Sequence, residues 1–159
     1  MNARTPDLDV IAAAARQTGG VSPSFVSASA TTVAGHHAEV FAVSSEGVLL
    51  HRWWYEDCWS DWHTMTLRRG ERASHVAAGA HDCFADLFVV TTDGQLLHRW
   101  WGPEQGWSTW SGWGAGFSGP ATVASQRPDH NEIWIIRNGV FSHRWLSQYH
   151  EWSAWQRFV

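Results

Sequence analysis

The sequence predicts an all-β protein built from three copies of one four-stranded unit. Two observations support this prediction: a set of landmarks that recurs three times in the same order, and a hairpin turn signal inside every copy. The chain has 159 residues, of which 44% are hydrophobic, so one domain can bury a core and wholesale disorder is excluded. Tryptophan is the compositional outlier, with 13 residues, and most of it lies in the repeated motifs.

The repeat is anchored by a run that begins with glycine and continues into a His-Arg-Trp sequence, at residues 47–54, 94–101 and 139–146. The three glycines are 47 and 45 residues apart. An acidic residue before an apolar pair precedes each run, and a Trp-Ser-X-Trp element follows it. The acids are Glu39, Asp86 and Glu132, and the Trp-Ser-X-Trp elements begin at Trp59, Trp107 and Trp152. Chance does not explain this order three times over.

Each copy is expected to contain four strands. The second strand is predicted at residues 39–44, 86–91 and 132–137, where β-branched and aromatic residues dominate. A turn containing Gly or Asn follows, and these residues tolerate positive φ. The His-Arg-Trp run predicts the third strand and the Trp-Ser-X-Trp element the fourth. The first strand is expected at residues 31–35 and its equivalents, from the alignment of Val33 with Val76 and Val123. Four strands in about 45 residues are typical of a β-propeller blade.

The first 30 residues lie outside the repeats. Thr5 and Pro6 predict the start of a short helix over residues 8–17, which Gly19 and Gly20 end. The segment is interpreted as a leader or linker, or alternatively as an arm that covers an exposed sheet edge. Because no basic region precedes an apolar stretch, we expect no standard secretory signal, and a protein that stays in the cytoplasm or leaves by a non-standard route.

Charge and hydropathy exclude two classes of partner. The net charge of −4 and the 16% of charged residues leave no basic field for nucleic acid. No apolar run is long enough to insert into a membrane. The two cysteines, Cys58 and Cys83, belong to different copies and are expected to be free and buried.

Three blades do not close a ring, because propellers usually need four to eight. The two unpaired flanks are expected to be apolar and to find a partner. We therefore expect a homodimer with a two-fold axis along the central channel, in which two copies complete a six-bladed ring. The alternative is that the chain is a fragment of a longer propeller protein.

The combined motif resembles the repeat of the PLL-type β-propeller lectins and, more loosely, the tachylectin and tectonin repeats. The resemblance covers residues 31–159 and divides them into blades at 31–65, 74–114 and 120–159. It implies glycan partners of the fucose or galactose type and a full ring, which has seven blades in those lectins. The third copy departs from the motif because Leu146 stands where the other copies have Trp.

The excess of tryptophan predicts a ligand site in grooves between blades. An indole face is a platform for the apolar C–H face of a sugar, while Arg and His bond its hydroxyl groups. The candidate stacking residues are Trp54 and Trp101, with Trp59 and Trp107 as the opposing wall. The candidate polar residues are His51, His98, Arg52 and Arg99. The competing interpretation of each Trp is packing between blades.

No cofactor, metal or catalytic function is expected. His51, His98 and His143 recur once per blade, but blade-related side chains usually lie too far apart to share one zinc ion. The recurring acids Glu39, Asp86 and Glu132 are expected to bond backbone or a turn, and no nucleophile or phosphate-binding motif is present. The predicted function is a carbohydrate-binding lectin, and the alternative is a non-catalytic propeller scaffold for protein interactions.

Overall fold

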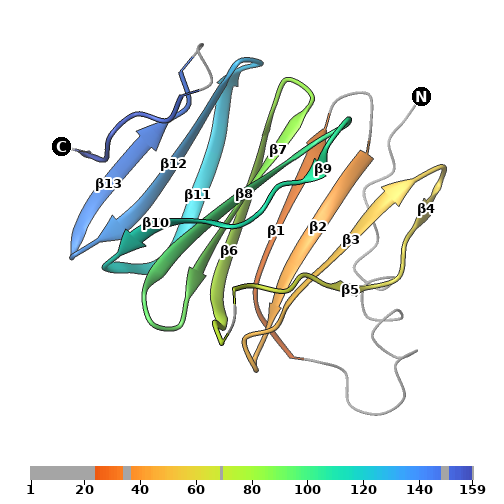
Figure 1. The fold of residues 1–159 in the computed structure, drawn as a ribbon, viewed down its shortest axis with the longest axis horizontal. Helices are drawn as coiled ribbons and strands as arrows, with labels where there is room; N and C mark the ends of the chain where they lie inside the picture. Colours follow the sequence, from red (N-terminus) through yellow and green to blue (C-terminus); the bar gives the residue numbers. More distant parts are fainter. Residues whose placement is uncertain (1–23, 34–36, 69, 148–150, 159) are drawn as a thin grey trace.

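The computed structural model describes residues 24–33, 37–68, 70–147 and 151–158. These residues form three antiparallel sheets and no helix, which confirms the all-β prediction (Figure 1). We call the sheets blades 1, 2 and 3 in chain order. Blade 1 consists of β1 (Phe25–Val33), β2 (His37–Ser44), β3 (Leu49–Tyr55), β4 (Cys58–Trp59) and β5 (His63–Thr64). Blade 2 consists of β6 (Ala73–His81), β7 (Phe84–Thr91), β8 (Gln95–Gly102), β9 (Gly106–Trp107) and β10 (Ser111–Ala115). Blade 3 consists of β11 (Phe117–Arg127), β12 (His130–Arg137), β13 (Val140–Trp145) and β14 (Gln156–Arg157).

The hairpin between the second and third strands follows the predicted turn chemistry in all three blades. Gly47 and Gly94 have φ of 77° and 79°, and Asn138 and Gly139 have φ of 50° and 74°. In blade 3, positive φ at both central residues gives the turn that matches the twist of two antiparallel strands, whereas blades 1 and 2 have a single glycine with positive φ, as in slightly longer hairpin loops. Local sequence therefore sets the register between β2 and β3, and between β12 and β13.

The fourth strand of each blade is broken at the Trp-Ser-X-Trp element, where a single strand was predicted. In blade 1, β4 and β5 both pair with β3, and the residues between them leave the ladder. The motif serine explains the break, because its hydroxyl takes the place of a backbone partner. Ser60 Oγ accepts a hydrogen bond from Trp53 N at 3.1 Å, and Ser108 Oγ accepts one from Trp100 N at 3.0 Å.

Each first strand is an edge strand of its own sheet, and β1, β6 and β11 lie side by side in the middle of Figure 1, with β6 between the other two. The hydroxyls of Ser27 and Ser29 accept hydrogen bonds from the backbone N–H groups of Val76 and Ala78, at 3.1 and 3.0 Å. On the other side of β6, a Cβ atom at Gly79 would lie 2.3 Å from Val123 Cγ1. Small residues thus allow the three blades to approach closely along these strands.

The first strand differs from the prediction in two respects. It begins at Phe25, so residues 25–30, which were assigned to the leader, belong to the sheet of blade 1. The aligned valines are also not equivalent: Val33 pairs with His37, Val76 with Val89 and Val123 with Ile133. The alignment was wrong because these strands are made of interchangeable small residues, which do not fix a register. The helix predicted over residues 8–17 lies outside the described residues.

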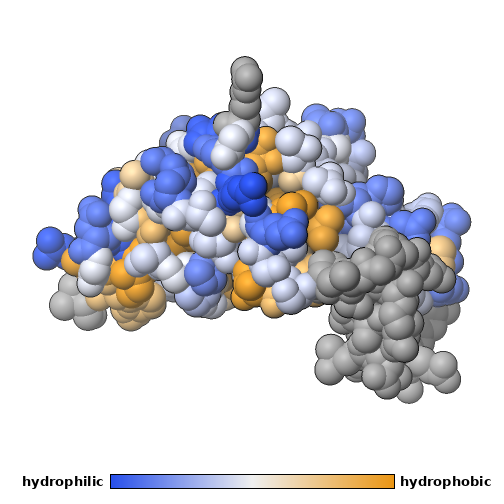
Figure 2. Space-filling model, turned by 90° about the horizontal axis from the view of Figure 1, so that it is seen from below, coloured by the Kyte–Doolittle hydropathy of each residue, from blue (hydrophilic) through white to orange (hydrophobic). Residues whose placement is uncertain are grey.

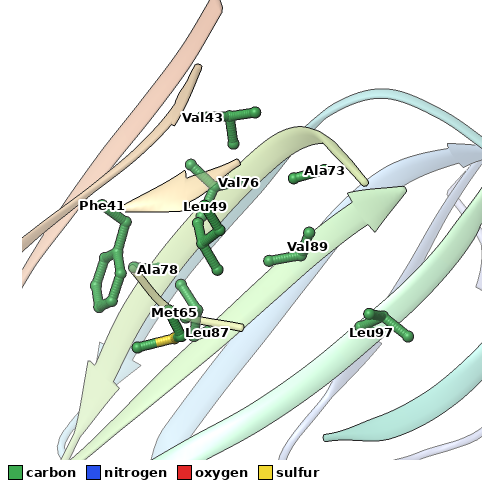
Figure 3. Close-up of a cluster of buried hydrophobic side chains, with 10 residues drawn as sticks. All are labelled: Phe41, Val43, Leu49, Met65, Ala73, Val76, Ala78, Leu87, Val89 and Leu97. Atoms are coloured by element: carbon green, nitrogen blue, oxygen red, sulfur yellow. The ribbon is translucent and has the colours of Figure 1, made fainter. Parts of the chain in front are cut away.

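The hydrophobic core is divided between two joints, where a joint is the packed interface of neighbouring blades. We call the side of a blade that faces the next blade its forward face, and the opposite side its back face. The first joint buries ten apolar side chains, drawn in Figure 3: Phe41, Val43, Leu49, Met65, Ala73, Val76, Ala78, Leu87, Val89 and Leu97. The second joint buries Ala77, Phe88, Val90, Leu96, Phe117, Ile133 and Ile135. Burial of each large side chain contributes about 1.5–3 kcal/mol.

Blade 2 is therefore buried on both faces, whereas blades 1 and 3 each have one packed and one open face. Alternate residues of β7 serve the two joints, with Leu87 and Val89 in the first and Phe88 and Val90 in the second. In the part of the chain that the structure describes, no helix is long and apolar enough to cross a membrane.

Candidate functional site: two grooves between the blades

A groove opens at each of the two joints. Groove 1, between blades 1 and 2, encloses about 530 Å³ and is lined by His37, Glu39, His51, Trp53, Trp101 and Trp107, with Tyr55 beside them. Groove 2, between blades 2 and 3, encloses about 790 Å³, and its lining includes Phe84, Asp86, His98, Trp100, Leu146 and Trp152. The same repeat positions supply both linings, so the two grooves are related copies of one site.

A buried carboxylate between two imidazoles forms the polar part of groove 1. Glu39 is 2% exposed, and its two oxygens lie 2.5 Å from His51 Nδ1 and 3.2 Å from His37 Nε2. Burial alone would raise the pKa of the Glu39 carboxyl, but the hydrogen bonds and charges of His37 and His51 outweigh it and hold the pKa below its usual value. The groove therefore presents an ionised carboxylate at neutral pH.

The other two blades repeat this arrangement. Asp86 lies 2.7 Å from His98 Nε2 and 3.0 Å from His81 Nδ1. Its burial is overcome by the same imidazole hydrogen bonds, which hold the pKa of the carboxyl far below its usual range. Glu132 lies 2.5 Å from His143 Nδ1 and 3.6 Å from His130 Nε2.

The expectation that these acids bond backbone or a turn is corrected, because their partners are histidine side chains. In each blade, the histidine of the His-Arg-Trp run lies on the strand that pairs with the strand of the acid. It follows the acid by 12 residues in blades 1 and 2 and by 11 in blade 3. Two blades also carry a His-X-Glu sequence, at residues 37–39 and 130–132. Residues two apart in a strand share a face, so this spacing was the signal that could have revealed the pairing.

The predicted aromatic residues separate into two places. Trp101 and Trp107 lie together on the blade 2 wall of groove 1, where Trp101 meets His37 edge-on with ring centroids 4.7 Å apart. Trp54 and Trp59 contact each other at 5.5 Å on the back face of blade 1. Trp101 and Trp107 thus form one wall, and the opposing wall in groove 1 is made by His51 and by a residue that the sequence analysis did not select, Trp53.

The predicted polar residues also have different roles in the geometry. His51 lines groove 1, and its equivalent His98 lines groove 2. Arg99 lies behind the blade 2 wall of groove 1, whereas Arg52 lies on the back face of blade 1, outside that groove. Each guanidinium packs on the two Trp residues of its own Trp-Ser-X-Trp element. The Arg99 Cζ atom is 5.1 Å from the ring centroids of both Trp107 and Trp110, and Nη2 donates to the Ser108 carbonyl at 2.6 Å. Such stacking orients the indoles.

Burial lowers the pKa of the Arg99 guanidinium, although the negative charge of Glu39 opposes this shift. Arginine stays protonated even so, and its charge faces the carboxylate of groove 1. In blade 3 the equivalent Arg144 reaches groove 2 and packs 4.1 Å from the centroid of Trp113.

Within the described ranges, no group of three His, Cys, Asp or Glu side chains is arranged to hold a metal ion. The two cysteines are free, but the expectation that both are buried is wrong. Cys58 is exposed at the hairpin between β3 and β4, and Cys83 is half-buried. Glu56 and Asp57 form that hairpin with positive φ, which turns the Cys58 side chain away from the core.

The fold and the grooves define a class of protein: a β-propeller segment of three blades with an aromatic groove at each joint. No protein-family model and no curated protein matches the sequence. Among solved structures, the chain is similar to the SapL1 lectin, determined in complex with alpha methyl fucoside, with a TM-score of 0.59 and 17% identity. The match covers 89% of this chain and 47% of that one, so this chain spans about half the length of SapL1.

A second solved structure is a fucose lectin from Kordia zhangzhouensis in complex with methyl-fucoside, with a TM-score of 0.48 and 15% identity. That match covers 83% of this chain and 97% of the other. At 17% identity, the likeness to SapL1 shows a shared fold, namely the arrangement of the blades.

Proposed function

We propose that this protein is a non-catalytic, carbohydrate-binding lectin that holds fucose-like neutral monosaccharides in the grooves between its blades. The observation that carries the proposal is the composition of groove 1, where indole rings stand beside a carboxylate held by two imidazoles. A sugar needs both features, because its C–H face stacks on an aromatic ring while its hydroxyls bond polar groups.

Each side chain of groove 1 has a role in this proposal. Trp101 and Trp107 form the stacking wall, and His51 supplies an imidazole for a sugar hydroxyl. Glu39 keeps His51 oriented and accepts a hydroxyl hydrogen bond through any lone pair that the imidazoles leave free. Of the remaining polar candidates, Arg99 supports the Trp107 wall from behind, and Arg52 packs on Trp59 on the back face of blade 1.

Fucose fits this groove better than a charged sugar does. It carries a methyl group where most hexoses have a hydroxymethyl group, and the aromatic wall offers that methyl an apolar contact. An acidic sugar would meet the ionised Glu39 carboxylate. The fold similarity to SapL1, a lectin solved with alpha methyl fucoside, supports the same ligand class.

We further propose that the lectin acts as a homodimer, in which two copies complete a six-bladed ring. Each chain contributes two internal grooves, so the dimer presents several weak sites on one particle. Sites that engage one glycan surface together gain avidity, because the second binding event is intramolecular. Light scattering that gives a mass near twice 17.9 kDa supports this assembly, whereas a stable monomer contradicts it.

A titration of intrinsic tryptophan fluorescence with methyl α-fucoside tests the ligand class. We expect saturable quenching, because Trp53, Trp101 and Trp107 line groove 1. The variant His51→Ala should weaken this response, while His75→Ala, on β6 and outside the lining of either groove, should leave it unchanged. If neither methyl α-fucoside nor a panel of neutral sugars changes the fluorescence, the lectin proposal is wrong.

A scaffold for protein interactions is the second candidate function. The open faces of blades 1 and 3 favour it, because they expose Trp54, Ile136, Phe141 and Phe158 by 37% or more. A negative sugar panel together with saturable binding of a defined protein partner to these faces would favour the scaffold.

A further inference from the structure

Each joint buries the same four repeat positions on the forward face of a blade. Two of these positions are counted from the repeated acidic residue and lie two and four residues after it. The third lies two residues after the turn glycine. The fourth lies six residues after the first Trp of the Trp-Ser-X-Trp element. In blade 1 these are Phe41, Val43, Leu49 and Met65, which are at most 5% exposed. In blade 2 they are Phe88, Val90 and Leu96, at most 3% exposed, together with Trp113, which packs against the same cluster.

Blade 3 carries large apolar side chains at the same four positions, and its forward face has no blade against it. They are Trp134, Ile136, Phe141 and Phe158. Ile136, Phe141 and Phe158 are 37%, 43% and 53% exposed. Figure 2 shows apolar surface at the left-hand end of the molecule, where blade 3 lies. The forward face of blade 3 thus has apolar side chains at all four positions that form a joint, although the described chain places no blade against it.

The back face of blade 1 is the matching half of that missing joint. The register of β1 on β2 makes Ala28 and Ala30 equivalent to Val76 and Ala78, which are 4% and 8% exposed in the first joint. Ala28 and Ala30 themselves are exposed. Trp54, the equivalent of Trp101, is 37% exposed. Among the residues that the structure describes, no blade covers this surface.

The two open faces also carry the two halves of a groove. Blade 3 has His130, Glu132, His143 and Trp145 at the positions of His37, Glu39, His51 and Trp53. Glu132 is hydrogen-bonded to His143 and lies 3.6 Å from His130, so it has an imidazole on each side, as Glu39 has, although the second is more distant. Blade 1 has Trp54 and Trp59 at the positions of Trp101 and Trp107. The two open faces therefore carry the same residue type as groove 1 at all six of these positions. At the seventh lining position, on the rim, blade 3 has Ser147 where blade 1 has Tyr55.

The position facing the carboxylate strengthens this match. In groove 2, Asn131 donates a hydrogen bond to Asp86 at 2.7 Å and occupies one of its oxygens. The equivalent residue is Ala85 in groove 1, and Ala38 on the back face of blade 1. A groove formed by blade 3 and blade 1 would therefore have an alanine there, as groove 1 does.

We infer that blade 3 of one copy packs against blade 1 of a second copy, and that this joint forms a third sugar site, the shared groove, to which each copy contributes one half. The inference rests on the proposed lectin function and extends it: the shared groove takes the same fucose-like monosaccharides as groove 1. It does not exist within one chain, because the stacking wall and the imidazole–carboxylate half lie on opposite ends of the molecule.

Complementation between two defective copies tests the inference. The background variant Trp53→Ala/Trp100→Ala removes one lining indole from groove 1 and one from groove 2, and leaves both halves of the shared groove intact. We expect this dimer to bind two methyl α-fucoside molecules by isothermal titration calorimetry. Added to the background, Trp54→Leu should weaken that binding about tenfold, as we expect for the equivalent Trp101→Leu in groove 1, and His143→Ala should weaken it at least as much. Leucine is a matched choice, because the chain itself has Leu146 at the equivalent position.

Co-expression of the two defective chains with different tags yields a heterodimer that two affinity steps isolate. One of its joints combines the intact blade 3 of the Trp54→Leu chain with the intact blade 1 of the His143→Ala chain. We therefore expect one site per heterodimer, half the value of the background dimer. A merely structural effect of either substitution would not be repaired by mixing. Light scattering on each variant checks that the dimer persists.

Three results would overturn the inference. The first is a wild-type monomer at all concentrations, whether its open faces stay bare or are covered by residues 1–23 or by further blades of a longer chain. The second is a background dimer that binds sugar equally well after Trp54→Leu. The third is a heterodimer without a restored site. A wild-type dimer that binds no sugar in any groove instead refutes the proposed function and leaves the pairing of the two faces standing.

Discussion

Grooves 1 and 2 occupy the same place in successive joints, yet they differ in three side chains that matter for a sugar. Groove 1 has Trp101 on its wall where groove 2 has Leu146. It has His37 beside the carboxylate where groove 2 has Phe84. In groove 2, the side-chain amide of Asn131 on the facing blade donates a hydrogen bond to the Asp86 carboxylate, and in groove 1 the equivalent residue is Ala85. The repeat thus sets where a groove forms, and a few side chains decide how much of it remains for a ligand.

The two grooves also differ in how fully protein groups occupy their carboxylates. Two imidazoles and one amide contact the Asp86 carboxylate, so protein groups occupy more of its hydrogen-bonding capacity. Glu39 has two imidazole partners and faces an alanine, Ala85, where Asp86 faces Asn131. We therefore expect groove 2 to contribute more to folding and groove 1 to contribute more to ligand affinity.

The largest expected effect is on stability, and it comes from Asp86→Ala. Removal of this carboxylate leaves His81, His98 and Asn131 without their buried partner, and we expect a loss of about 3–5 kcal/mol in the free energy of unfolding. Urea denaturation measures it. Glu39→Ala should cost less, and Glu104→Ala, in the exposed turn after β8, should change stability by less than about 0.5 kcal/mol. A larger loss at Glu39 than at Asp86 would reverse our ranking of the two grooves.

Acid should reduce stability through the same two carboxylates. Their pKa values are lower in the folded protein than in the unfolded chain, so the unfolded chain takes up protons first as the pH falls. The stabilisation is complete above about pH 5, and it is lost as the pH drops below about 4. Urea midpoints between pH 7 and pH 3 measure the decline. The double variant Glu39→Gln/Asp86→Asn should flatten it, and an unchanged slope would show that other groups dominate.

Asn131→Ala removes the facing amide and makes groove 2 more similar to groove 1. A hydrogen bond to a charged group is lost, so we expect a cost of about 2 kcal/mol in the free energy of unfolding. Asp86 Oδ2 would keep His81 as a partner and lose the amide, and the hydrogen-bonding capacity so released should strengthen the binding of methyl α-fucoside in groove 2. Calorimetry on the Trp53→Ala background, in which groove 1 is disabled, separates the two effects. Weaker binding in that experiment would mean that Asn131 contacts the sugar.

The smallest expected effect comes from exchanging the wall residue. Trp101→Leu converts the wall of groove 1 into that of groove 2, and we expect about tenfold weaker binding at groove 1, or about 1.4 kcal/mol. Leu146→Trp is the reciprocal change and should strengthen groove 2. Calorimetric titration with methyl α-fucoside measures both. Equal affinity of Trp101→Leu and wild type would remove Trp101 from the stacking wall.

Much of the fold was predictable because the relevant information is local. The second strands were predicted from residue 39, 86 and 132 onward, and β2, β7 and β12 begin two residues earlier in each case. The turns at Gly47, Gly94 and Asn138 were predicted from their tolerance of positive φ. The first strands were misaligned because they consist largely of small residues, which do not distinguish one register from the next.

The sequence by itself determined that three similar sheets would form and that indoles, imidazoles and carboxylates would recur in each. Only the tertiary structure decided which of them meet. Trp53 and Trp54 are neighbours in the chain, but successive residues of a strand point to opposite faces. Each face of β3 combines apolar side chains with one basic side chain, His51 on one face and Arg52 on the other. The pattern therefore has no polar side to orient it. The packing of blade 2 against blade 1 places Trp53 in groove 1 and leaves Trp54 on the open face.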